Sequence, residues 1–148
     1  MTRKILLLGL FFILCPALLV ADFDYDFKDD NGESVHLPDL PIISYDAPGI
    51  FAALLGSHRP EFLLTSKKEG LEKIRFITLD FKRPARQFSN DKLTAVYVLD
   101  KDQLVIGYHL FEPEETKAVM RINGVINYVE IYVECEAHGL WQKKLRFE

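Results

Sequence analysis

Apolar and polar residues alternate along most of the chain after Gly70, with the period of two that is typical of half-buried β-strands. The apolar positions are rich in β-branched and aromatic side chains, and short polar turns separate one segment from the next. No helical period interrupts this series, so we expect the carboxyl-terminal half of the chain to be all β. The pattern predicts strands over Ile74–Phe81, Leu93–Leu99, Leu104–Phe111, Ala118–Ile122, Val125–Glu134 and Leu140–Phe147.

The preceding part of the chain is less regular. Asp22–Asp30 alternates acidic with aromatic residues and leads into Asn31–Gly32, which predicts an edge strand and a hairpin turn. The apolar run Ile50–Leu55 fits either a short buried helix or a strand. With these elements we expect about seven strands in one immunoglobulin-like antiparallel β-sandwich. The prolines Pro38, Pro41, Pro48 and the nearby Pro60 predict that Val35–Gly49 is an extended loop, with one short strand around Ile42–Ile43.

The first residues have the build of a secretory signal. Arg3 and Lys4 precede an apolar run, and small residues follow it at Ala17 and Ala21. We therefore expect a signal peptide over residues 1–21, cleaved near 17 or 21, and an exported domain over residues 22–148 in the periplasm or outside the cell. The alternative is a retained anchor, but 17 residues are the lower limit for crossing a bilayer and Pro16 interrupts them.

Composition and charge narrow the classes of partner. The chain has 148 residues, 49% of them hydrophobic, which is enough for the core of a single domain. Its net charge is -4, and removal of Arg3 and Lys4 with the signal would leave 16 basic against 22 acidic residues, or -6. No concentrated basic patch is present in the sequence, so nucleic acid and stable membrane association after cleavage are not expected.

One short segment near the carboxyl terminus carries metal-binding chemistry. Cys135 and His138 are three residues apart at the end of a predicted strand, close enough to bind one ion. Gly139 would let the backbone turn sharply there, and Trp141 would form an apolar wall. Cys135 is the only cysteine left after signal cleavage, so it is expected to be buried, paired between chains or held by a metal. Its strand places Val125, Val129, Ile131 and Val133 on the same, core-facing side.

The motif Cys135-x-x-His138-Gly139-Leu140-Trp141 resembles the signature of the desulfoferrodoxin and neelaredoxin family, the superoxide reductases. Lys117–Ile122 with the following turn is similar to that family's closing hairpin, and His36-Leu37-Pro38 is similar to its first histidine motif. The resemblance implies a mononuclear non-haem iron with four equatorial imidazoles, one axial thiolate and a sixth position open to superoxide. It implies Cys135 as the axial ligand, with His138 and His36 as imidazole ligands.

The chain departs from that family at two places. The family's middle motif, His-Pro-Met followed by a second histidine, has no counterpart in Arg83–Ser89, and Val35 stands where active members carry a lysine. A displaced loop could bring His58 to the site in place of a missing imidazole, so the candidate metal ligands are Cys135, His138, His36 and His58. For the remaining histidine, His109, we favour a hydrogen-bonded position at the sheet surface over ligation.

If the iron site is complete, the resemblance implies an enzyme that reduces superoxide to hydrogen peroxide with electrons from a donor protein. A local positive patch from Arg83, Arg86 or Lys92 would help to attract this anionic substrate. The alternatives are a non-catalytic sandwich that has lost the metal and serves as a binding or carrier module, and a copper electron carrier with Gln142 as its axial residue. The sequence leaves the electron donor and a homo-oligomeric state open.

Overall fold

The computed structural model describes residues 27–29, 31–81 and 92–148. The predicted signal peptide and the Arg83–Ser89 segment lie outside the described residues. Within the described ranges, no helix is long and apolar enough to span a membrane. In chain order the elements are β1 (Ile42–Ser44), the 3-10 helix η1 (Gly49–Leu54), α1 (Leu55–His58), β2 (Glu61–Glu69), β3 (Glu72–Asp80), β4 (Leu93–Leu99), β5 (Val105–Leu110), β6 (Lys117–Asn123), β7 (Tyr128–Cys135) and β8 (Gly139–Arg146).

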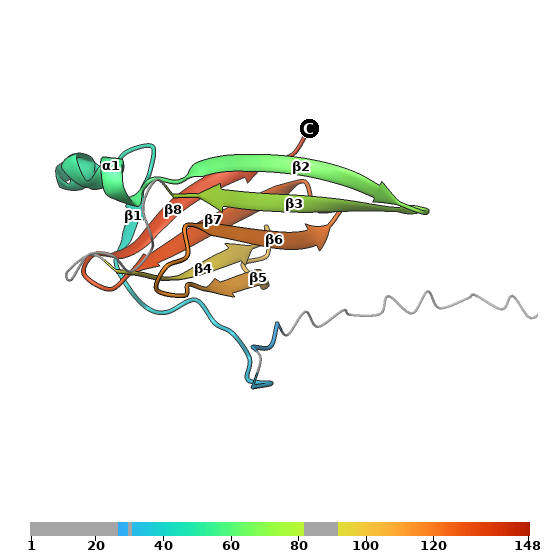
Figure 1. Cartoon of the computed structure of the whole chain (residues 1–148), viewed down its shortest axis with the longest axis horizontal. Helices are drawn as coiled ribbons and strands as arrows, with labels where there is room; N and C mark the ends of the chain where they lie inside the picture. Colours follow the sequence, from blue (N-terminus) through green and yellow to red (C-terminus); the bar gives the residue numbers. More distant parts are fainter. Residues whose placement is uncertain (1–26, 30, 82–91) are drawn as a thin grey trace, which may run out of the picture.

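The strands form two sheets that face each other (Figure 1). One sheet has the order β1-β8-β7-β4-β5 and the other has the order β2-β3-β6. Neighbouring strands are antiparallel except β1 and β8, which run parallel with Ile43 opposite Trp141. The expected all-β sandwich is therefore confirmed, with eight strands in the described residues.

Strand β2, a nine-residue edge strand paired with β3 along its full length, is not predicted by the hydrophobic pattern. Only Phe62 and Leu64 of this strand are half-buried, and its other side chains are exposed. The alternation is therefore short and gives way to the polar residues Thr65–Glu69. In Figure 1 the turn that joins β2 to β3 reaches beyond the other strands, which agrees with the exposure of the residues on either side of it, from Thr65 to Lys73.

Two other predicted boundaries are corrected by local contacts. Val125 was expected inside a core-facing strand, but it is 84% exposed and lies in a turn, because its N–H donates to the Asn123 side chain at 3.0 Å. The strand begins at Tyr128. The run Ile50–Leu55 forms η1 and the first residue of α1, and η1 has no buried residue, so the expectation of a buried element is wrong there.

The main core lies between the two sheets. Alternate residues of β7 point into it, and they continue to Cys135 at the end of that strand. The core-facing side of β8 contributes Trp141, which is fully buried. This packing fixes the strand end that carries the cysteine. The core includes Val96, Val98, Val129, Ile131 and Val133 from the larger sheet and Ile77, Leu79, Ala118, Met120 and Ile122 from the smaller one.

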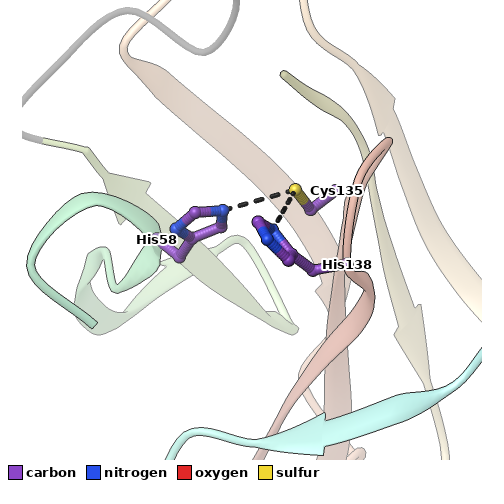
Figure 2. Close-up of side chains that lie close together, drawn as sticks. All are labelled: His58, Cys135 and His138. Atoms are coloured by element: carbon purple, nitrogen blue, oxygen red, sulfur yellow. Dashed lines mark hydrogen bonds between the residues drawn. The ribbon is translucent and has the colours of Figure 1, made fainter. Parts of the chain in front are cut away.

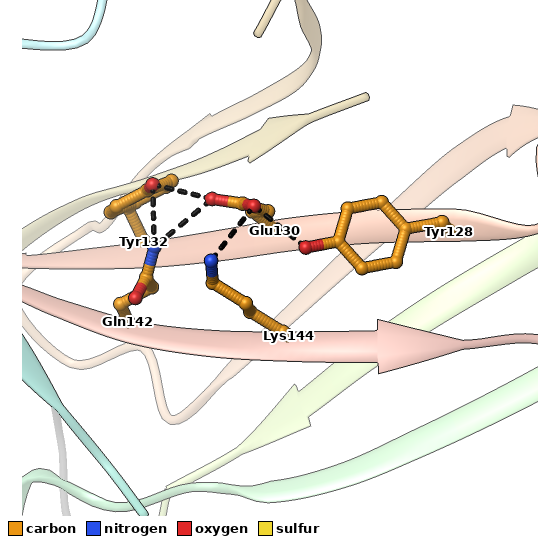
Figure 3. Close-up of polar contacts among 5 residues, drawn as sticks. All are labelled: Tyr128, Glu130, Tyr132, Gln142 and Lys144. Atoms are coloured by element: carbon orange, nitrogen blue, oxygen red, sulfur yellow. Dashed lines mark hydrogen bonds and ion pairs between the residues drawn. The ribbon is translucent and has the colours of Figure 1, made fainter. Parts of the chain in front are cut away.

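The outer face of the larger sheet carries a network of hydrogen bonds around Glu130, which is 6% exposed (Figure 3). Its two carboxylate oxygens accept from the hydroxyls of Tyr128 at 2.6 Å and Tyr132 at 2.7 Å. The Gln142 amide donates to the same carboxylate at 3.0 Å, and the Lys144 ammonium lies 3.2 Å from it. Burial acts to raise the pKa of Glu130, but these donors outweigh it and the pKa is lowered.

We predict that Glu130→Gln destabilises the fold near neutral pH by about 1–3 kcal/mol, since the two tyrosine hydroxyls lose a charged acceptor. The lowered pKa of Glu130 makes this stabilisation present above the ordinary glutamate pKa and lost as the pH falls through the folded-state value. Urea unfolding near neutral pH and near pH 3 measures the difference. Glu72→Gln, at an exposed position, is the control. An equal loss at both pH values would contradict this account.

Candidate metal centre

The turn between β7 and β8 places the first two candidate ligands. Cys135 is the last residue of β7 and pairs with Gly139, the first residue of β8, so only three residues form the turn. The N–H of His138 donates to the Cys135 carbonyl at 3.2 Å, which closes the turn. The Cys135 side chain is fully buried and that of His138 is half-buried. Their Sγ and Nδ1 atoms lie 3.3 Å apart.

Gly139 is required for this turn. Its φ of +94° is a conformation that L side chains rarely adopt, and a Cβ there would lie 2.5 Å from the Pro41 carbonyl oxygen. The same carbonyl accepts the N–H of Leu140 at 2.8 Å. The segment before β1 therefore packs directly against the turn that carries the Cys-x-x-His motif.

The third candidate ligand comes from a distant part of the chain. His58 ends α1 and is 1% exposed. Its Nε2 lies 3.3 Å from the Cys135 Sγ, across 77 positions of sequence. Figure 2 shows both imidazole rings directed toward the same sulfur. The ligand atoms of the three residues all lie within 4.8 Å of one another, and the two rings meet edge to face at 5.2 Å.

The two sulfur–nitrogen distances fit a shared metal ion. With bonds of about 2.3 Å to sulfur and 2.0 Å to nitrogen, an ion would hold these atoms about 3.0–3.6 Å apart for bond angles between square and tetrahedral. Both sulfur–nitrogen distances are 3.3 Å. One thiolate and two imidazoles suit iron, zinc or copper better than magnesium or calcium, which prefer oxygen ligands.

Aromatic side chains enclose the group. The Trp141 ring stacks on His58 with 5.1 Å between centroids, so the expected apolar wall is confirmed. Phe51 of η1 meets His138 edge to face at 5.9 Å. Tyr45 packs against Trp141 at 5.3 Å and donates its hydroxyl to the His58 carbonyl at 2.8 Å. Burial, assisted by the nearby Cys135, raises the pKa of Tyr45 well above its ordinary value, which keeps this hydroxyl protonated.

The structure thus brings together Cys135, His138 and His58 of the four predicted ligands. His36 is exposed in the segment before β1 and is not a member of this group, so its role as a ligand stays a prediction. His109 bonds to Glu115 at 2.9 Å, as favoured for a sheet-surface histidine. Gln142 donates to Glu130 and Tyr132 on the outer face, which leaves the copper alternative without its expected axial residue.

Sequence reasoning missed the contribution of Tyr45 and Phe51. Neither belongs to a motif with His58 or Cys135, and their roles depend on contacts between segments far apart in the chain. The one available signal was the concentration of aromatic and apolar residues in an otherwise proline-rich stretch.

No protein-family model matches the sequence, and no curated protein matches it either. Solved structures do. The superoxide reductase (neelaredoxin) from Ignicoccus hospitalis matches with a TM-score of 0.53 at 14% identity, over 72% of this chain and 93% of that one. The chain has a fold similar to that of a superoxide reductase. A superoxide reductase from Nanoarchaeum equitans is 18% identical over 62% of this chain and 94% of its own, with a TM-score of 0.44.

We predict that Gly139→Ala lowers the free energy of unfolding by more than Gly70→Ala does. Both glycines have positive φ, but a Cβ at Gly70 meets no atom within 4 Å, whereas at Gly139 it meets the Pro41 backbone. Each strained backbone conformation costs on the order of 1–3 kcal/mol, and the clash adds to that cost only at Gly139. Urea unfolding of the two variants measures the difference. Equal losses would show that the packing of Pro41 on the turn is unimportant.

Proposed function

We propose that this chain binds one mononuclear iron ion through Cys135, His138 and His58 and reduces superoxide to hydrogen peroxide with electrons from a donor protein. The observation that carries the proposal is the convergence of one thiol and two imidazoles at 3.3 Å within a fold similar to a superoxide reductase. Bound iron would supply the single electron that superoxide requires, and the donor would then restore the ferrous state.

The residues of the chain have separate tasks in this proposal. The Cys135 thiolate donates electron density to the metal, and its full burial keeps water from the sulfur. The imidazoles of His58 and His138 fix the ion beside it. Trp141 stacks on the His58 ring and Phe51 packs edge to face on the His138 ring, which restricts the movement of both imidazoles.

Two basic residues adjoin the group through the backbone, although the chain as a whole is acidic. Arg59 follows His58 directly and is exposed, and it acts electrostatically on the buried Tyr45 hydroxyl. The Glu136 N–H donates to the Lys92 carbonyl at 2.9 Å, so the backbone of Lys92 lies beside the β7–β8 turn. These two residues would attract superoxide locally. Arg83 and Arg86, the other expected cations, lie outside the described residues.

Export is part of the proposal. The signal-like residues 1–21 support it. The single cysteine that would remain after cleavage cannot form an internal disulfide. Because Cys135 is buried, it is protected from pairing with thiols of other proteins.

We predict that Cys135→Ser abolishes iron binding and the thiolate-to-iron charge-transfer band, because the strongest donor is lost. His58→Ala and His138→Ala are expected to weaken iron binding by at least tenfold, whereas His109→Ala, whose ring bonds to Glu115, should retain it. Iron content by elemental analysis and visible absorption check this. Full iron occupancy in Cys135→Ser would exclude the site, and His36→Ala tests the remaining predicted ligand in the same assay.

We further expect the iron-loaded protein, supplied with a chemical reductant, to form one hydrogen peroxide per superoxide consumed without releasing oxygen. Peroxide and oxygen are measured together after a pulse of superoxide. Release of oxygen in equal amount to peroxide would indicate dismutation and contradict the proposed reaction. Copper with an intense blue absorption in the purified protein would instead indicate electron transfer, and a folded protein that takes up no metal would indicate a non-catalytic module.

A further inference from the structure

We infer that the Leu54 carbonyl and the Ser57 hydroxyl hold His58 in the tautomer whose unprotonated Nε2 faces Cys135, and that Tyr45 fixes the end of α1 in place. Ser57 and Tyr45 are thus positioning residues for the metal ligand His58. The inference rests on the proposed metal site, but it concerns side chains that bind no metal themselves.

The tautomer follows from the partners of the other ring nitrogen. The Nδ1 of His58 lies 3.1 Å from the Leu54 carbonyl oxygen. A carbonyl oxygen only accepts hydrogen bonds, so a contact at this distance requires the proton to be on Nδ1. In the neutral ring Nε2 then carries the lone pair, and Nε2 is the atom that lies 3.3 Å from the Cys135 sulfur. The hydrogen bond at Nδ1 therefore determines that Nε2 is the nitrogen available to bind a metal.

Ser57 adds to the same selection. Its hydroxyl lies 3.0 Å from the Leu54 carbonyl and 2.9 Å from the His58 Nδ1. A hydroxyl has a single proton, and donating it to the carbonyl leaves its lone pairs to accept from Nδ1–H. All three contacts are satisfied together only when Nδ1 is protonated. Two residues of the same helical turn, Leu54 and Ser57, therefore fix the tautomer of His58.

Tyr45 holds this turn against the larger sheet. α1 has four residues, too few to be a stable helix in isolation, so its position must come from tertiary contacts. The Tyr45 hydroxyl donates to the His58 carbonyl at 2.8 Å, and the Tyr45 N–H donates to the Gln142 carbonyl of β8 at 3.0 Å. Its ring packs on Trp141, which stacks on His58. The imidazole is thus fixed at its backbone, on its face and at Nδ1.

Nitrogen NMR of the full, metal-free chain tests the tautomer directly. We expect the ¹⁵N shifts of His58 to report a protonated Nδ1 and an unprotonated Nε2, and Ser57→Ala to reduce this preference. Protonation of Nε2 in the wild-type protein would overturn the inference. This measurement needs no bound metal, so it separates the inference from the proposed iron chemistry.

Titration with Co²⁺, followed by its thiolate charge-transfer absorption, tests the effect on binding. We expect Ser57→Ala and Tyr45→Phe each to weaken Co²⁺ binding roughly tenfold. Ser57→Thr, which keeps the hydroxyl, should bind as the wild type does. Ser66→Ala, an exposed serine on β2, is the matched control and should have no effect.

A double-mutant cycle distinguishes positioning from a general loss of stability. Ser57→Ala should weaken Co²⁺ binding when His58 is present and have no effect in a His58→Ala background. Equal weakening in both backgrounds, or wild-type affinity of Ser57→Ala, would overturn the inference. If the wild-type protein itself binds no Co²⁺, the proposed metal site fails, and the NMR result still decides whether His58 is held in this tautomer.

Discussion

The pairing of Cys135 with Gly139 across the β7–β8 turn is the constraint on which the candidate site depends. It leaves three residues for the reversal of the chain, and this tight turn directs His138 back toward the sulfur. Pro41 supports this turn in two ways. Its carbonyl oxygen lies 2.5 Å from where a Cβ at position 139 would be, so only glycine fits there, and the same oxygen accepts the N–H of Leu140. Two strands and the preceding loop therefore determine the geometry of one thiol and one imidazole.

His58 joins this local pair through long-range packing. Its short helix lies at the end of the sandwich where β7 ends (Figure 1), and the aromatic residues Tyr45 and Trp141 connect it to the larger sheet. Trp141 belongs to the main core while its ring faces His58, so core packing and ligand position depend on the same side chain. A change that loosens the core near β8 would therefore also shift the His58 imidazole.

The sequence was sufficient where structure follows from local pattern. Strand alternation predicted β3 to β8 because these strands have one or both faces buried, and the Cys-x-x-His spacing predicted the pair Cys135 and His138 because a tight turn joins them. Edge strand β2 escaped prediction because most of its side chains are exposed. The sequence did not determine the approach of His58 to Cys135, because local periodicity contains no information on which distant segments meet across a core.

The burial of the three ligands is unequal, and this inequality bears on the proposed reaction. Cys135 and His58 are buried, whereas His138 is half-buried, so among the described residues His138 is the ligand that reaches the surface. The Phe51 ring lies against the His138 imidazole on that side, with 5.9 Å between the ring centroids. Superoxide is small and negatively charged, and the acidic chain as a whole repels it. For the proposed reaction, cations near the group such as Arg59, which directly follows His58, would have to offset that repulsion, and charges act mainly within the screening distance of about 8–10 Å.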